Sequence, residues 1–210
     1  MEARHHAVLC DVDGVLRMWP EDGGMPAVDR RYGLAEGTLA GTAFHPDHLL
    51  PAITGRVTDQ EWRAGVAAAL ADRCGGPDRS RALVDTWTAV VPAVNTELAD
   101  LLRLVRRVVP VLLVSNATGR LESDLSELGL DDCVTDVVNS SRVGVAKPDP
   151  AIYRAALGRA GAGPWATAGP ASVLFVDDTP RNVAAAEEIG FTGVLYRSMD
   201  DLRPHLEALL

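Results

Sequence analysis

The chain has 210 residues, of which 47% are hydrophobic and 23% are charged, and its formal net charge at pH 7 is −9. This composition indicates one globular domain, or one domain with a sizeable insert, and enough apolar residues to bury a core. An acidic chain without a basic run argues against a nucleic-acid binder, and no apolar stretch reaches the roughly 18 residues of a membrane span.

The cysteines and the N-terminus indicate an ordinary reducing environment. Cys10, Cys74 and Cys133 are an odd, scattered set with no CxxC pair, so they predict neither a disulfide framework nor structural zinc. The N-terminal residues put charged and histidine side chains before a short apolar run, which is not a signal peptide. We therefore expect a cytoplasmic protein whose partner is a small molecule rather than a nucleic acid or a membrane; the oligomeric state is not predicted.

The first element in chain order is a short apolar strand at residues 7–10. The next stretch, residues 18–94, contains no convincing strand and begins with a loop at residues 20–26. Thr58 and Glu61 then form a T-x-x-E capping box, which predicts a helix start, and a second helix is expected over residues 78–88. The apolar face of the first helix is assigned to Trp62, Val66, Ala69 and Leu70. This region is predicted to be a small helical subdomain inserted after the first strand.

Strands and helices alternate through the rest of the chain. Strands are expected at residues 108–114, 134–138, 173–176 and 193–196. Apolar residues at helical spacing predict one helix around residues 98–105 and another around 121–128, with Gly129 as its stop. Asp149-Pro150 and Thr179-Pro180 are start signals for two further helices, which Gly161 and Gly190 would end. Strands that alternate with helices predict an α/β fold with a parallel sheet.

The strongest chemical signal is the hexapeptide Asp11-Val12-Asp13-Gly14-Val15-Leu16, directly after the first strand. Residues two apart on an extended chain point to the same side, about 6.6 Å apart, so Asp11 and Asp13 are expected to converge on one ligand. The carboxyl ends of parallel strands are where open α/β sheets bind ligands, and Gly14 allows a sharp turn there. Alone, the pattern is also compatible with a solvated pair of aspartates in a turn.

A second acidic pair, Asp177-Asp178, ends the predicted strand at residues 173–176. If the two strands are neighbours, three or four carboxylates meet, and such a cluster needs a cation to neutralise it. Oxygen ligands with room for water and phosphate suit Mg²⁺. The alternative is that the pair only complements the dipole at the start of a helix, which accounts for Asp178 but not for the first acidic pair.

Two further short segments carry groups suited to phosphate. Ser115-Asn116 follows the strand at 108–114 and offers a hydroxyl and a backbone N–H as donors, although an ordinary turn or N-cap is the favoured interpretation of this segment taken alone. Lys147 lies in Lys147-Pro148-Asp149-Pro150, where the prolines stiffen the backbone around an ammonium group. A surface lysine is the simpler interpretation of that segment taken alone.

As an ordered set, the four segments resemble the motifs of the haloacid dehalogenase-like (HAD) superfamily. The resemblance implies a Rossmann-like, three-layer parallel-sheet core over residues 1–17 and 95–210, and a small helical cap domain over residues 18–94. Such a cap closes over the site. It also implies a Mg²⁺-dependent phosphatase that acts on a small phosphorylated metabolite.

The resemblance also implies a role for each motif residue. Asp11 would be the nucleophile that forms an aspartyl-phosphate, and Asp13 the general acid and base. Mg²⁺ would be held by Asp11, the backbone carbonyl of Asp13, Asp177 and Asp178. Ser115, the Asn116 amide and Lys147 would bind the phosphoryl group. Asn182 is expected to have a structural role.

Three alternatives use the same fold. Haloacid dehalogenases apply the first aspartate to carbon and do not need the second, so Asp13 favours phosphorus chemistry. Sugar-phosphate mutases keep both aspartates, so a phosphotransferase remains an alternative function for this chain. A non-catalytic phosphate-binding regulatory protein is the third, since fold does not prove function.

Within the insert, Arg56 is the residue we select for contact with substrate, because Gly55 and Thr58 place it at a loop-to-helix junction.

Overall fold

The computed structural model describes residues 5–20, 24–161 and 169–210. A five-stranded sheet forms its centre, in the order β5-β4-β1-β6-β7, and every paired neighbour is parallel. Its strands are β1 (Ala7–Cys10), β4 (Val111–Ser115), β5 (Asp136–Asn139), β6 (Val173–Asp177) and β7 (Thr192–Leu195). β1, β4 and β6 are buried throughout, because helices cover both faces of the sheet.

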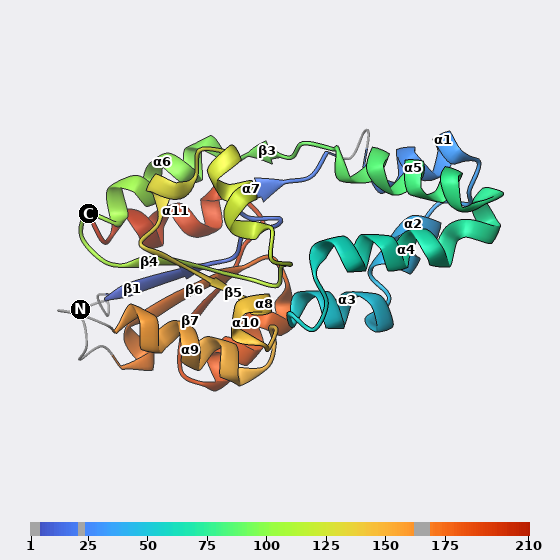
Figure 1. The fold of residues 1–210 in the computed structure, drawn as a ribbon. Coiled ribbons are helices and arrows are strands. Elements are labelled where there is room, and N and C mark those ends of the chain that lie inside the picture. The colour runs from blue at the N-terminus through green and yellow to red at the C-terminus, as the bar shows by residue number, and fades with distance from the viewer. Residues whose placement is uncertain (1–4, 21–23, 162–168) are drawn as a thin grey trace.

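Helices form a layer on each side of this sheet (Figure 1). Alternate residues of β1 show the division, since Val8 and Cys10 belong to one apolar cluster and Ala7 and Leu9 to the other. The first cluster is completed by α6 (Thr96–Val105), α7 (Leu121–Glu127) and α11 (Met199–Glu207). The second is completed by α9 (Pro150–Ala160) and α10 (Pro180–Glu188). The predicted Rossmann-like, three-layer α/β core is confirmed.

The segment between β1 and α6 forms a helical insert with its own core. Its helices are α1 (Met25–Tyr32), α2 (Thr38–Ala43), α3 (Pro46–Ile53), α4 (Asp59–Cys74) and α5 (Pro77–Thr88). They enclose an apolar cluster that includes Leu39, Val66, Leu70 and Leu83, with Trp62 packed against it. Figure 1 shows the insert beyond the end of the sheet at which β1 leads into it.

A short ribbon joins the insert to the sheet domain. Residues Arg17–Met18 (β2) and Ala93–Val94 (β3) pair antiparallel where the chain leaves and re-enters. The expectation that residues 18–94 contain no strand was therefore wrong at their ends, because two-residue strands are too short to show an alternating pattern. Residues 21–23 of the predicted loop at 20–26 lie outside the described residues.

Helix signals in the sequence match the structure closely. Thr58 and Glu61 form both hydrogen bonds of the capping box of α4. Asp149 accepts a hydrogen bond from the amide of Ala151 and caps α9, which begins at Pro150. In α4, however, Ala69 is exposed and Ala67 is buried in its place.

β1 has the expected boundaries, and those of the other strands of the sheet differ by up to three residues from the ones expected. The segment predicted at 108–114 begins only at Val111, because Val108 and Val109 form the turn after α6. Strand ends depend on pairing with neighbours, which the local pattern does not contain. No helix of the described residues is long and apolar enough to cross a membrane.

Candidate active site

Three carboxylates meet at the carboxyl ends of the two central strands. Asp11 directly follows β1, Asp177 ends β6, and the pairing of Cys10 with Val176 sets them side by side. With Asp178, each offers a carboxylate oxygen within 4.8 Å of the others. Asp177 is fully buried and Asp11 is 7% exposed, so most of this negative charge is held away from water. The predicted proximity of the acidic segments is confirmed.

Lys147 supplies the only positive side chain in direct contact with this group among the described residues. Its ammonium Nζ lies 2.7 Å from Asp11 Oδ1 and 2.7 Å from Asp177 Oδ2, and its side chain is 1% exposed. Sequence analysis left open a surface lysine, which the structure contradicts. A signal was available: Lys147 is the only lysine in the chain, whose other basic residues are arginine and histidine.

The loop that carries Lys147 is fixed by Asn116, directly after β4. The Asn116 side chain donates a hydrogen bond to the Lys147 carbonyl (2.8 Å) and accepts one from the Lys147 backbone N–H (2.7 Å). Ser115 ends β4 beside β1 and is buried. The segment predicted to bind phosphate through its backbone therefore also positions the lysine, a role that sequence analysis missed.

Asp177 is held by a second set of donors. Asn182 donates from Nδ2 to both carboxylate oxygens (3.0 and 3.1 Å), and the amide of Thr179 donates to Oδ1 (2.9 Å). The hydroxyl of Tyr153 in α9 donates to the Asn182 carbonyl (2.9 Å). These contacts agree with the structural role expected for Asn182. Tyr153 was not foreseen, because on the sequence it is one apolar position of a helix.

Asp13 does not join the carboxylate cluster through its side chain. The carboxylate instead accepts hydrogen bonds from Arg17 (2.8 and 3.0 Å) and from the indole N–H of Trp19 (2.7 Å). The Asp13 side chain is therefore not part of the group formed by Asp11, Asp177 and Asp178, and its convergence with Asp11 on one ligand stays a prediction. The reason is the turn at Gly14, whose amide bonds to the Arg17 carbonyl and brings that guanidinium back over Asp13.

Burial dominates the electrostatics of the cluster. The pKa of Asp11 is raised to about 7, mainly by burial and also by the negative charge of Asp177, against the opposing attraction of Lys147. Burial lowers the pKa of Lys147, but the attraction of Asp11 and Asp177 outweighs it and leaves that pKa above its ordinary value.

This charge balance is a test of whether the residues suit a metal ion. One ammonium faces three carboxylates, so two negative charges stay uncompensated when all three are ionised. The donors are all oxygens, which is the set that Mg²⁺ prefers. The group therefore fits a divalent cation of that kind.

Gly14 closes the cluster on one side. A Cβ atom at this position would lie 2.1 Å from Asp178 Oδ2, and φ is +81°, a backbone conformation that favours glycine. The turn after the first strand therefore needs glycine both for its conformation and to make room for Asp178.

The insert touches the sheet domain beside this site. Asp59, the first residue of α4, accepts a hydrogen bond from the Thr118 hydroxyl (2.8 Å), three residues after Ser115. Gly55 packs so closely on the Ser141 carbonyl that a Cβ there would lie 2.1 Å from its oxygen. Arg56 follows in the exposed loop between α3 and α4. The loop that bears our selected substrate contact thus lies at the junction of the two parts.

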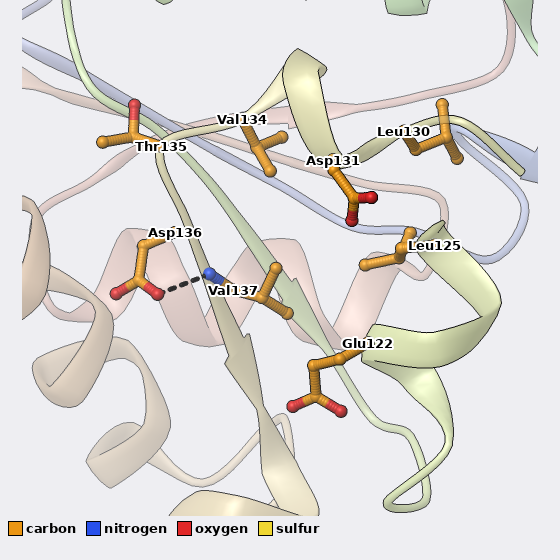
Figure 2. Close-up of a pocket in the computed structure, with 8 residues that line it drawn as sticks. All are labelled: Glu122, Leu125, Leu130, Asp131, Val134, Thr135, Asp136 and Val137. Carbon is orange, nitrogen blue, oxygen red and sulfur yellow. Dashed lines mark hydrogen bonds between the residues drawn. The ribbon is translucent and has the colours of Figure 1, made fainter. Parts of the chain in front are cut away.

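A separate pocket lies along the edge strand β5 (Figure 2). It is lined by Glu122, Leu125, Leu130, Asp131 and residues 134–137. The last of these enter β5 at its amino end, whereas the carboxylate cluster is at the carboxyl ends of the strands. This pocket is therefore not part of the carboxylate site.

The fold and this site define an α/β protein with a group of carboxylates and one buried ammonium at the carboxyl edge of a parallel sheet, the edge at which open α/β sheets bind ligands. A sequence model described as haloacid dehalogenase-like hydrolase matches residues 5–190. The chain belongs to this family.

Solved structures of similar fold agree with that assignment. A HAD family enzyme from Bacteroides thetaiotaomicron is 20% identical, with 96% of this chain and 98% of that chain covered and a TM-score of 0.76. Its complex with magnesium and inorganic phosphate is 21% identical over 94% and 97%, with a TM-score of 0.74. L-2-haloacid dehalogenase from Xanthobacter autotrophicus is 22% identical over 97% and 83%, with a TM-score of 0.62. No curated protein sequence matched the chain.

Proposed function

We propose that the chain is a Mg²⁺-dependent phosphohydrolase that acts on a small phosphorylated metabolite through an aspartyl-phosphate. The observation that carries this proposal is the uncompensated charge of the cluster of Asp11, Asp177 and Asp178 around one buried lysine. A catalyst for displacement at carbon does not need these uncompensated negative charges. A divalent cation bound beside a phosphoryl group does need them, because the carboxylates balance the positive charge of the ion. The similar fold that holds magnesium and inorganic phosphate adds support.

In the proposed mechanism the Asp11 carboxylate attacks phosphorus, and the bond from phosphorus to the leaving oxygen breaks. Asp13 gives a proton to that oxygen, and in the second half it takes one from the water that attacks the aspartyl-phosphate. Asp13 is suited to this by its position, since its side chain is 38% exposed beside the buried nucleophile. The bond between Asp11 and phosphorus breaks, inorganic phosphate leaves, Asp11 is again a carboxylate and Asp13 is again protonated.

The remaining motif residues bind the transferred group. Lys147 would hold phosphoryl oxygens while it fixes the nucleophile, and the Ser115 hydroxyl and the Asn116 amide would donate to the same group. Asp11, Asp177, Asp178 and the backbone carbonyl of Asp13 would hold Mg²⁺. When bound, Mg²⁺ supplies charge neutralisation at the phosphoryl oxygens.

Residues 18–94 would act as a cap over a core of residues 1–17 and 95–210. Two contacts support this division: the hydrogen bond between Asp59 and Thr118, and the packing of Gly55 on Ser141, both beside the site. Closure of such a cap excludes water and brings loop residues such as Arg56 toward the substrate.

The test is phosphate release from 4-nitrophenyl phosphate by the purified protein, with Mg²⁺, with EDTA, and with the variants Asp11→Asn and Asp13→Asn. The proposal expects activity that needs Mg²⁺ and both aspartates, with Asp136→Asn as a matched control on an exposed carboxylate. Release of halide from a 2-haloacid that is indifferent to Asp13→Asn would instead identify a dehalogenase. Transfer of phosphate between positions of a sugar without net release would identify a mutase, and binding of phosphate without turnover a regulatory protein.

A further inference from the structure

Arg17 has an unusual environment for an arginine near a surface loop. Its side chain is 7% exposed, although it carries a full positive charge. It donates from Nε to Asp13 Oδ1 (2.8 Å) and from Nη2 to Asp13 Oδ2 (3.0 Å), so that each carboxylate oxygen receives one bond. Paired bonds of this kind fix the plane of a carboxylate as well as its position.

Arg17 is itself held by three other contacts, two of its guanidinium and one of its backbone. Its Nη1 lies 3.4 Å from Asp124 Oδ2 in α7. The ring of Trp19 lies against it, with Cζ 5.2 Å from the ring centroid. Its backbone is paired with Val94 in the ribbon that leads into the insert. The guanidinium of Arg17 is therefore held in one position, and its N–H donors point at the Asp13 carboxylate in a fixed geometry.

Trp19 adds a third bond to the same carboxylate. Its indole Nε1–H donates to Asp13 Oδ1 (2.7 Å), and the residue is 50% exposed. The Asp13 side chain is 38% exposed, so its inner side is fixed while its outer side stays open to a ligand. The two donor residues, Arg17 and Trp19, lie in β2 and directly after it, where the chain enters the insert. The orientation of Asp13 is therefore linked to the ribbon formed by β2 and β3.

We propose that Arg17 is a positioning residue for Asp13, and that it sets the carboxylate in the orientation from which the leaving oxygen is protonated. This inference rests on the proposed function and deepens it. Arg17 is set apart from the metal cluster and from Lys147, and it acts on the reaction only through Asp13. The consequence is specific: loss of Arg17 should weaken protonation of the leaving group and leave attack by Asp11 largely intact.

The experiment compares two substrates that differ only in a para nitro group, 4-nitrophenyl phosphate and phenyl phosphate. The nitrophenolate leaves readily without a proton, whereas phenolate depends much more on an acid. We expect Arg17→Gln to lower the single-turnover rate of phenol release from phenyl phosphate by about ten-fold or more, and that of nitrophenol release from 4-nitrophenyl phosphate by less than about three-fold, because general acid catalysis contributes on the order of 10² to 10⁴ in rate. The single-turnover release reports the first step alone, before Asp13 acts as a base on water.

Two further variants separate this role from a purely structural one. Trp19→Phe removes only the third bond and keeps the aromatic ring, so it should show the same substrate dependence with a smaller loss even if Arg17→Gln folds poorly. In the Asp13→Asn background, Arg17→Gln should cause no further loss on either substrate, because both changes act on one step. Arg159→Gln, which breaks an exposed pair with Asp136, is the matched control.

The outcomes are distinguishable. An equal loss on both substrates, or additive losses with Asp13→Asn, would overturn the role of Arg17 and leave the proposed function standing. If Arg17→Gln does not fold and Trp19→Phe turns over both substrates at the wild-type rate, the inference is equally overturned. A wild-type protein that releases no phosphate from either substrate would overturn both proposals.

Discussion

Replacement of Lys147 by methionine tests the electrostatic balance of the site most directly. The change keeps most of the side-chain volume but removes the one cation that touches Asp11 and Asp177, whose side chains are 10% and 0% exposed. Removal of one partner from a buried pair costs about 3–5 kcal/mol, because the remaining charge is left buried and unpaired. For a chain of this size that free energy lowers Tm by roughly 6–20 °C.

The assay is thermal unfolding by circular dichroism at pH 8, above the pKa of about 7 that Asp11 has in the wild type, with and without Mg²⁺. Arg159→Met is the control, since its pair with Asp136 is exposed on both sides and should contribute less than about 1 kcal/mol. Mg²⁺ should stabilise Lys147→Met more than the wild type, because the competing ammonium is gone. At 100 times its Kd the ion contributes about 2.7 kcal/mol, which would restore much of the lost Tm.

Two results would refute this reasoning. If Lys147→Met unfolds at the wild-type temperature without Mg²⁺, the ammonium does not compensate the buried carboxylates. If the double variant with Asp11→Asn is no more stable than Lys147→Met alone, the cost does not arise from unpaired charge. Because Lys147 is the only lysine, lysine-specific isotope labelling also yields a single side-chain resonance that should shift when Mg²⁺ binds.

Three further predictions concern the pH dependence of the site, a turn and the insert. Since the pKa of Asp11 is raised from 3.8 to about 7, mainly by burial, the metal-free protein should lose stability as pH rises from about 4 to about 7. The stabilisation by Mg²⁺ should grow over the same pH interval. Asp11→Asn should abolish both trends in thermal unfolding. Gly14→Ala should displace Asp178 and weaken Mg²⁺ binding by about ten-fold or more in calorimetry, by analogy with the 10–100-fold effect of disturbing ligand support, whereas Gly119→Ala, which meets open space, should not. Arg56→Ala should raise KM for the true substrate several-fold with Tm unchanged; unchanged kinetics would remove Arg56 from the substrate site.

Local signals in the sequence predicted most of the fold. The apolar run before Asp11 gave β1 to the residue, and the capping signals at Thr58 and Asp149 gave the starts of two helices. Such signals work because a helix cap or a buried strand is decided by neighbours within a few positions. The two-residue strands β2 and β3 were not predicted, because each is a strand only through its pairing with the other, across the intervening residues 19–92.

The candidate site divides in the same way. The sequence identified the two acidic segments by their place at the ends of strands, since parallel strands bring such ends to one edge. Ser115-Asn116 and Lys147 were identified only as members of an ordered set that resembles the motifs of the HAD superfamily. The sequence did not reveal that Asn116 holds the lysine loop, that Lys147 is buried between two carboxylates, or that Arg17 draws Asp13 away from the cluster. These arrangements depend on contacts between segments far apart in the chain, on burial, and on competition between charged partners. Only the folded structure fixes those quantities, because a charge acquires its pKa and its partner from whatever surrounds it in space.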